Sequence, residues 1–349
     1  LDEMNAWAFL RRMGVTKRFI HQFWSFVSMA IMNVPIELCS AGAIMRFYQR
    51  ILGKSEYYFG FPDGGLGDVF APSAKAEIER NGGRVLLESS VRRFLVEHDC
   101  VVGVELHDGR KIRARHTVAA LPPSALRDLI PPAWSDAHDV FGDLVHFHPS
   151  PYISSFIWFD RKLTDLKMWA RVHRARDLNC DFYDLSNIHR GWDERPSIIT
   201  SNIIYCGRVA HMSDEEIVAE TVREITENLP VARDARVTHS VVNRIPMAIH
   251  CPYPGTEKRR PATRSPFDGL LLAGDWIQTG LPSSMESAVM SGWRAAEAIG
   301  ADHGRPQQLA VAHGMEGLPR AFNELARYFP PKVMMRWARG IRDRVEEVV

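Results

Sequence analysis

The sequence predicts an α/β protein of α+β character, built from two interleaved domains, and three observations support this fold class. Short apolar strands alternate with helical segments, three closely spaced alternating strands predict a β-meander, and the strand signals pass in and out of two regions of the chain. Strands that alternate with helices are typical of layered α/β folds. The 349 residues are enough for two domains with separate cores.

The first region holds the predicted β-meander. Residues 5–60 are expected to be mainly helical, and a glycine-rich turn then leads into a helix at residues 69–80. Strands are predicted at 84–87, 91–96, 101–106 and 111–113, with a tight turn at Asp108-Gly109. The apolar stretch 117–123 ends in two prolines, which predicts a strand end and a turn.

The second region is predicted to be a mixed sheet with helices. Strand patterns occupy residues 152–159, 197–205 and 237–245, and a helical pattern occupies 214–228. Neither region contains an apolar run that approaches the roughly 20 residues needed to span a bilayer.

Composition excludes several classes of function. The chain has 43 basic and 42 acidic residues, and this balance argues against nucleic-acid binding, which needs a concentrated positive field. No cysteine or histidine spacing is typical of a metal site. The five cysteines lie far apart, which favours free thiols and a reducing compartment; they are Cys39, Cys100, Cys180, Cys206 and Cys251.

The segment LLLAGDWIQTGLPSSMESAVMSGWRAAEAI, residues 270–299, is the most informative stretch. Residues 270–273 read as a buried strand that stops at Gly274 and Asp275, and Ser283 with Glu286 reads as a capping box that starts a helix. The expected buried face of this helix consists mostly of small residues: Met285, Ala288, Val289, Gly292, Ala295, Ala296 and Ile299. Unpaired N–H groups at the helix start favour an anion or a group that becomes one.

These motifs resemble the FAD-dependent amine oxidase and carotenoid desaturase superfamily. LLLAGDW with TGLPSSMESAVMSGWRAA resembles its C-terminal flavin signature, and PDGGLGDVFAPSAKAEIERNGGRVLLESSVRRF resembles its middle segment. Within the superfamily the chain is similar to phytoene desaturase, zeta-carotene desaturase and hydroxysqualene dehydroxylase. The resemblance implies a bound FAD and a FAD-binding Rossmann-like domain, interleaved with a substrate domain.

The resemblance also implies a set of cofactor-binding residues. Gly274 would let the backbone approach the cofactor, Asp275 would accept hydrogen bonds from the ribityl hydroxyls, and amides near Met285 would face the flavin pyrimidine edge. Val91 would contact the adenine half, or serve only as a strand residue. The full set is Val91, Ala120, Leu121, Gly274, Asp275, Pro282, Ser284, Met285, Glu286 and Ala288. No catalytic residue is predicted, and His211 and His250 are expected to be structural or exposed.

One part of the superfamily pattern is missing. The strand and GxGxxG loop that would hold the FAD pyrophosphate do not occur before residue 60, so the sequence is expected to begin inside a domain. The expected organisation has five parts: 1–60, a helical part of the substrate domain; 61–125, the FAD-domain portion with the β-meander; 126–262, the substrate domain; 263–302, the C-terminal FAD-binding segment; and 303–349, a helical tail.

The predicted function is that of an FAD-dependent oxidoreductase acting on a long apolar isoprenoid. Two alternatives stay open, namely a flavin amine oxidase and a non-catalytic fragment that lacks the nucleotide-binding half. An apolar tunnel or ordinary core packing would each explain the following side chains: Phe19, Phe23, Trp24, Met29, Met32, Met45, Phe47, Phe156, Trp158, Phe159, Met168 and Trp169.

The expected partner is therefore a lipophilic small molecule, with no nucleic acid involved. The C-terminal residues 320–349 combine apolar and basic side chains in a pattern that suits contact with a membrane surface, or packing as a solvated helix on the domain. The expected location is the cytoplasm, peripheral to a membrane.

Overall fold

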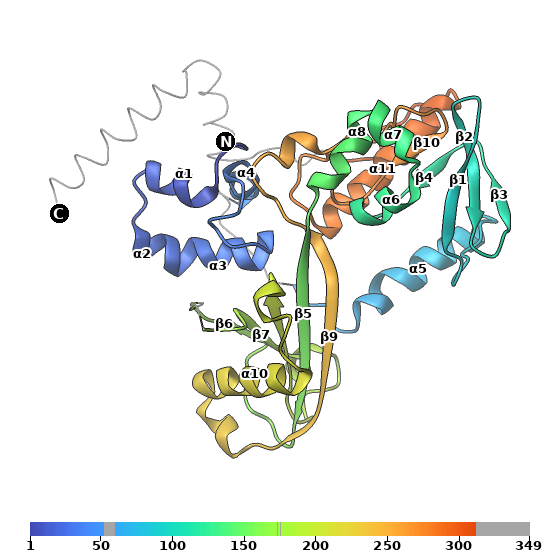
Figure 1. Cartoon of the computed structure of the whole chain (residues 1–349). Coiled ribbons are helices and arrows are strands. Elements are labelled where there is room, and N and C mark those ends of the chain that lie inside the picture. The colour runs from blue at the N-terminus through green and yellow to red at the C-terminus, as the bar shows by residue number, and fades with distance from the viewer. Residues whose placement is uncertain (52–59, 173, 175, 312–349) are drawn as a thin grey trace.

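The computed structural model describes residues 1–51, 60–172, 174 and 176–311, and its elements surround two long antiparallel strands (Figure 1). These strands are β5 (Pro149–Phe159) and β9 (Val237–His250), which pair from Pro149 opposite His250 to Phe159 opposite Val237. A sheet with α10 lies at one end of this ladder, and the β-meander, β4, β10 and α11 lie at the other. The prediction of an α/β fold is confirmed.

The N-terminal region is helical, as the sequence predicts. Trp24 and Tyr48 pack in its core with ring centroids 4.3 Å apart, and Val34, Ile36 and Ile44 are buried around them. Two of its turns are π-helical. Its elements are α1 (Ala6–Arg12), α2 (Lys17–Phe19), η1 (Ile20–Trp24), α3 (Ser25–Val27), η2 (Ser28–Met32) and α4 (Ala41–Ile51).

The substrate region contains a five-stranded sheet in the order β6-β7-β8-β5-β9. Helix α10 (Asp214–Asn228) starts at a Ser213–Glu216 capping box and covers one face of the sheet, where Ile157 and Phe182 are buried against it. Phe156 and Trp158 alternate with Ile157 along β5, so they lie on the opposite face. The remaining elements are β6 (Met168–Ala170), β7 (Asp181–Asp184), α9 (Leu185–Ile188), β8 (Ile198–Ile204), η4 (Cys206–Val209) and η5 (Pro230–Asp234).

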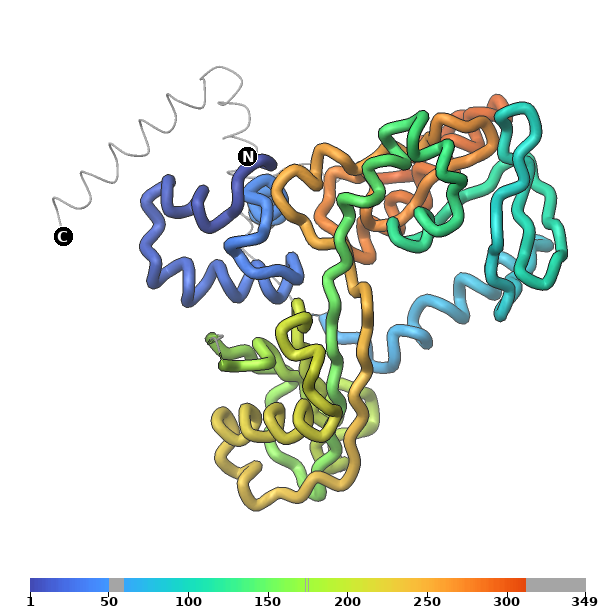
Figure 2. Tube along the Cα trace, viewed as in Figure 1, coloured from blue at the N-terminus to red at the C-terminus, as the bar shows by residue number. Residues whose placement is uncertain are grey.

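The third region holds the meander and a short parallel pair. The meander order is β1-β2-β3, and β10 pairs with β4 in parallel, with Leu270 opposite Thr117. Segments distant in sequence, 117–129 and 270–302, thus lie side by side (Figure 2). The elements are α5 (Leu66–Arg80), β1 (Val91–Glu97), β2 (Cys100–Leu106), β3 (Lys111–Arg113), β4 (Thr117–Ala119), α6 (Pro123–Leu129), α7 (Pro132–Ala137), α8 (Asp139–Gly142), η3 (Asp143–His146), η6 (Glu257–Arg259), β10 (Leu270–Leu272) and α11 (Met285–Asp302).

The prediction of a strand at residues 84–87 is wrong. Leu86 and Leu87 are exposed, and this stretch is irregular, with a bend that begins at Leu87. A strand requires a neighbour for its backbone hydrogen bonds, and no strand of the described residues pairs with this one. No helix among the described residues has the length and apolar character needed to cross a membrane.

Candidate cofactor site

The candidate site lies at the carboxyl ends of the two parallel strands β10 and β4. The Ala273 amide donates to the Ala119 carbonyl at 3.1 Å, and the Trp276 indole N–H donates to the Leu121 carbonyl at 2.9 Å. These two bonds hold the loop after β10 against the loop after β4. Ligands of layered α/β proteins bind at this edge of a sheet.

Gly274 is required by the geometry of the loop. Its φ of +133° disfavours residues with a side chain, and a Cβ at this position would lie 2.7 Å from the Trp276 ring. Its amide donates to the Ser291 hydroxyl at 2.7 Å, which ties the loop to α11. The loop can therefore present backbone at close range to a ligand, as the resemblance implies.

The start of α11 differs from the prediction. Ser284, not Ser283, is the N-cap residue, and its hydroxyl accepts a hydrogen bond from the Ser287 amide at 3.1 Å. Ser283 instead lies 3.3 Å from His250 Nδ1, so the predicted Ser283–Glu286 capping box is wrong. The N-terminus of α11 still lies beside the loop.

The predicted buried face of α11 is also wrong in part. Met285 and Val289 are exposed at 61% and 54%, and Gly292 and Ala296 are exposed as well. Only Ala295 of the predicted face is fully buried, while the buried positions of the helix are Ser287, Met290, Ser291 and Ala295. The physical reason is that Ser291 accepts a hydrogen bond from the Gly274 amide and Ser287 donates one to the Asp275 carbonyl. The face of α11 that carries these serines therefore packs against the loop after β10.

Nine of the ten predicted cofactor residues lie on the elements that meet at this site. Ala120 and Leu121 follow β4, Gly274 and Asp275 follow β10, and Pro282, Ser284, Met285, Glu286 and Ala288 lie at or before the first turns of α11. Val91 lies apart from them as the first residue of β1, opposite Leu106 in the meander. Cofactor contact by all ten residues stays a prediction.

Asp275, the second residue of the loop 274–281, is half-buried. Burial raises the pKa of its carboxyl group, and the charge of Arg260 and a hydrogen bond from Ser283 oppose that rise. A carboxylate at this position can accept hydrogen bonds from the hydroxyl groups of a ligand.

Sequence reasoning missed the residues that hold the loop in place. Arg260 is 4% exposed, and Ser287 and Thr279 are buried with their hydroxyl oxygens 2.6 Å apart. The only sequence signal for Arg260 is its position within KRRPATRSP, where it looks like any surface arginine.

His250 is buried behind the Pro282–Ser283 segment. It is 2% exposed, and burial together with the nearby Arg260 charge lowers the pKa of its ring to about 3. His211 is exposed. Both positions agree with the expectation that these histidines are structural or exposed, and the neutral ring of His250 packs on Phe147 with centroids 5.2 Å apart.

The stability of the protein is expected to fall below pH 6.5 because His250 is buried in its neutral form. The unfolded chain takes up a proton near pH 6.5, while the folded chain takes it up only near pH 3. The contribution is therefore present above pH 6.5 and is lost as the pH falls, by about 2 kcal/mol between pH 7 and pH 5. Urea unfolding at both pH values measures it, and His250→Gln should abolish this share of the pH dependence. An unchanged pH dependence in His250→Gln would contradict the account.

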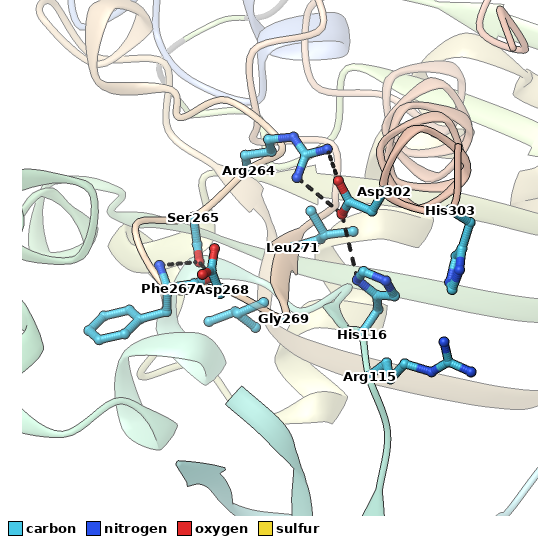
Figure 3. Close-up of a pocket in the computed structure, with 11 residues that line it drawn as sticks. Arg115, His116, Arg264, Ser265, Phe267, Asp268, Gly269, Leu271, Asp302 and His303 are labelled. Carbon is cyan, nitrogen blue, oxygen red and sulfur yellow. Dashed lines mark hydrogen bonds and ion pairs between the residues drawn. The ribbon is translucent and has the colours of Figure 1, made fainter. Parts of the chain in front are cut away.

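A separate polar pocket of about 480 Å³ lies at the opposite, amino end of β10 (Figure 3). Arg264 and Asp302 form an ion pair of 2.7 Å there, and His116 Nδ1 lies 3.8 Å from Asp302. None of the ten predicted cofactor residues lines this pocket. It lies away from the strand ends at which ligands of such sheets bind, so it is not the candidate cofactor site.

The described residues hold no cluster of histidine, cysteine or acidic side chains suited to a metal ion. Cys251 is fully buried in the helical core, and burial raises the pKa of its thiol. A buried protonated thiol is a poor nucleophile, which argues against a covalent flavin link through Cys251.

The predicted tunnel residues divide between core and surface. Trp24, Met29, Met32 and Phe159 are buried core residues, Phe19 and Phe23 are exposed at 49% and 39%, and Met45, Phe47, Phe156, Trp158, Met168 and Trp169 are half-buried. Core packing therefore explains the first group. The predicted amphipathic tail at 320–349 lies outside the described residues.

Comparisons with known proteins identify the family. Residues 6–300 match the family model described as flavin containing amine oxidoreductase, so the chain belongs to this family. It is 26% identical over 315 residues to 15-cis-phytoene desaturase of Synechococcus elongatus, covering 86% of this chain and 65% of that protein. It is 29% identical over 331 residues to 15-cis-phytoene desaturase of Solanum lycopersicum, covering 92% and 55%.

A solved structure confirms the fold. The putative protoporphyrinogen oxidase from Exiguobacterium sp. 255-15 superposes with a TM-score of 0.66 at 13% identity, covering 86% of this chain and 67% of that one. The chain spans roughly half to two thirds of the length of the two phytoene desaturases. The predicted family and its flavin cofactor are thus confirmed.

Replacing Asp275 with alanine is expected to weaken FAD binding by the full-length gene product. The loss of charge-assisted hydrogen bonds should cost about 1.5–3 kcal/mol, which is roughly a 10- to 150-fold increase in Kd. Fluorescence titration with FAD measures it. Asp268→Ala, an exposed aspartate on the loop before β10, is the matched control. Equal FAD affinity in Asp275→Ala and wild type would remove Asp275 from the site.

Proposed function

We propose that the full-length gene product containing this chain is an FAD-dependent oxidoreductase that acts on a long apolar isoprenoid. The observation that carries the proposal is the loop 274–281, which stands at the carboxyl end of β10 and is bonded to the first turns of α11. A backbone loop with a required glycine, a carboxylate and a helix N-terminus fits the ribityl and pyrimidine parts of a flavin.

Each part of the site has its own role in this proposal. Gly274 gives close backbone access, Asp275 accepts hydrogen bonds from cofactor hydroxyls, and the amides at the start of α11 favour negative charge on the pyrimidine edge. The bound flavin supplies the redox chemistry by accepting two electrons from the substrate. The protein binds and orients the substrate C–H bond and excludes water.

Two observations support an isoprenoid as substrate. Similar proteins are named phytoene desaturases. In addition, the sheet face opposite α10 carries Tyr152, Phe156 and Trp158, which are half-buried along one strand. Each CH₂ group buried against such a face contributes about 0.8 kcal/mol, so a hydrocarbon chain needs few polar anchors.

One observation favours an amine as the alternative substrate. Asp181, at the start of β7, is 5% exposed; its Oδ2 accepts a hydrogen bond from Tyr183 at 2.7 Å, while its Oδ1 has no partner among the described residues. Burial raises the pKa of this carboxyl. A substrate ammonium group would restore its charge and pair with it. The non-catalytic alternative predicts no flavin reduction by either substrate class.

The substrate class is tested by anaerobic flavin bleaching in the full-length gene product. Phytoene in liposomes is expected to bleach the oxidised flavin and to give a desaturated product. Hydroxysqualene, whose dehydroxylation to the hydrocarbon and water consumes two electrons, is expected to reoxidise the pre-reduced flavin, whereas a panel of soluble amines is expected to leave the oxidised flavin unchanged. Rapid bleaching by an amine, with no response to either isoprenoid, would transfer the protein to the amine oxidase class. A flavin whose redox state changes with none of these substrates would support the non-catalytic alternative.

We also propose a location at the cytoplasmic surface of a membrane. The support is the mixture of apolar and basic residues at 320–349 and the low water solubility of the proposed substrate. Co-sedimentation with anionic liposomes tests it, and full recovery of the protein in the supernatant would contradict it.

A further inference from the structure

Arg260 is a buried arginine that hydrogen-bonds the loop 275–281, which follows β10 at the candidate cofactor site. Its guanidinium donates to the carbonyls of Asp275 at 2.6 Å, Trp276 at 3.1 Å and Leu281 at 2.6 Å. It also lies 3.4 Å from the Ser287 hydroxyl of α11. One buried side chain thus binds both ends of the loop 275–281 and the first turn of the helix beside it.

The three carbonyls point toward Arg260. A peptide plane that directs its carbonyl to one side directs its N–H group to the other. The guanidinium therefore fixes the orientation of these peptide units: the Trp276 N–H is directed away from it, the Ile277 N–H donates to the Gly274 carbonyl at 3.5 Å, and Pro282 carries no N–H. A planar group with five donors in a fixed fork suits three carbonyl acceptors, and the three donors of a lysine ammonium on a flexible stem do not reproduce this geometry.

The charge of Arg260 is only partly compensated. Glu257 lies 3.5 Å from it and is shared with Arg46, which forms an ion pair with the same carboxylate. Two cations thus face one anion, and the surplus positive charge lies beside the Asp275 carboxyl. The other groups near Asp275 are the uncharged ring of His250, the Ser283 hydroxyl, which donates a hydrogen bond, and two charged side chains. These are Glu286, which is exposed at the start of α11, and Arg294, which donates to the Thr279 carbonyl at 3.2 Å.

We propose that Arg260 is a positioning residue of the cofactor site, which orients the loop 275–281 through its carbonyls and places a buried positive charge beside the Asp275 carboxyl, the acceptor for cofactor hydroxyls. This inference rests on the proposed flavin site and adds a residue that contacts no ligand itself. Burial alone raises the pKa of the Asp275 carboxyl, and the Arg260 charge opposes that effect. Loss of the Arg260 charge is therefore expected to raise the pKa of the Asp275 carboxyl further.

The test is the pH dependence of FAD affinity in the full-length gene product, measured from pH 5 to pH 9. Four variants are compared with wild type: Arg260→Lys, Arg260→Met, Glu257→Gln and the control Arg264→Met. Arg264 lies four residues away and is 56% exposed in its ion pair with Asp302, so its loss should leave the profile unchanged. Thermal unfolding of each variant reports whether the fold is retained.

The variants are expected to separate geometry from charge. Arg260→Lys should weaken FAD binding about tenfold at every pH and leave the acid midpoint of the profile in place, because the charge is kept. Arg260→Met should weaken binding and shift that midpoint upward. Glu257→Gln removes the compensating anion and should shift the midpoint downward, so the proposal stays testable if Arg260→Met does not fold.

Two results would overturn the inference. The first is a pH profile of FAD affinity that is the same in Arg260→Lys, Arg260→Met and wild type. The second is an FAD affinity that falls equally at every pH in Arg260→Met while the acid midpoint moves in neither Arg260→Met nor Glu257→Gln, which would indicate a purely structural arginine. Failure of the wild-type protein itself to bind FAD would instead contradict the proposed function.

Discussion

The 349-residue chain alone is expected to purify without FAD, whereas the full-length gene product is expected to retain it. The described part of the chain holds only one side of a dinucleotide site. A single helix N-terminus contributes about 0.3–2 kcal/mol toward an anion, which is far too little for tight FAD binding. The pyrophosphate needs a further glycine-rich loop at a helix N-terminus, and no strand precedes α5 within residues 60–65 to form one.

The surface of the chain supports this expectation. Within the residues that the structure describes, the parallel sheet of β10 and β4 has two strands, although parallel sheets normally have several strands with both faces covered. Along α11, Met285, Val289 and Trp293 form an exposed apolar stripe, and α5 has no buried residue. Such faces are expected to pack against further protein.

Flavin absorbance per chain after gel filtration distinguishes the two forms. A 349-residue chain that keeps stoichiometric FAD would show that the described residues suffice for the cofactor. Purification of the full-length product without FAD as well would contradict the proposed cofactor site itself.

Replacing Trp276 with alanine is expected to destabilise the chain by about 3–5 kcal/mol, the range typical of large aromatic deletions in a core. Trp276 is fully buried, packs on Phe147 with centroids 5.3 Å apart, and donates to the Leu121 carbonyl. Its loss would leave both a cavity and an unpaired carbonyl where the two loops of the site meet. Urea unfolding of the 349-residue chain measures the change.

Trp293→Ala is the matched control for this substitution. Trp293 lies on α11 of the same segment but is 50% exposed, so its removal should change stability by less than about 0.5 kcal/mol. Equal losses of unfolding free energy in Trp276→Ala and Trp293→Ala would contradict the burial of Trp276 in the core described above.

Local sequence patterns predicted most of the regular elements. The helix at 214–228 has the predicted bounds because a capping box starts it and an apolar stripe continues through it. The strands of the meander follow their alternation of apolar and polar residues, and β3 has the predicted bounds 111–113. Such signals are local, so they need no knowledge of the partner.

The errors concern features that only a neighbouring segment determines. Residues 84–87 have the composition of a strand but no partner among the described residues. The orientation of α11 depends on the hydroxyl partners that the loop after β10 requires, so its apolar residues were wrongly assigned to the buried face. Arg260 was missed because burial of a charged residue depends on distant acceptors, here the carbonyls of residues 275, 276 and 281.

The central claim is that the full-length gene product holds a non-covalent FAD at the loop after β10. It is tested most directly by acid precipitation of the purified protein, followed by measurement of flavin in the supernatant and the pellet for wild type and Asp275→Ala. The account predicts one FAD per wild-type chain, released entirely into the supernatant, and substoichiometric FAD in the variant. Yellow colour that stays with the precipitated protein, or a variant with full FAD content, would contradict it.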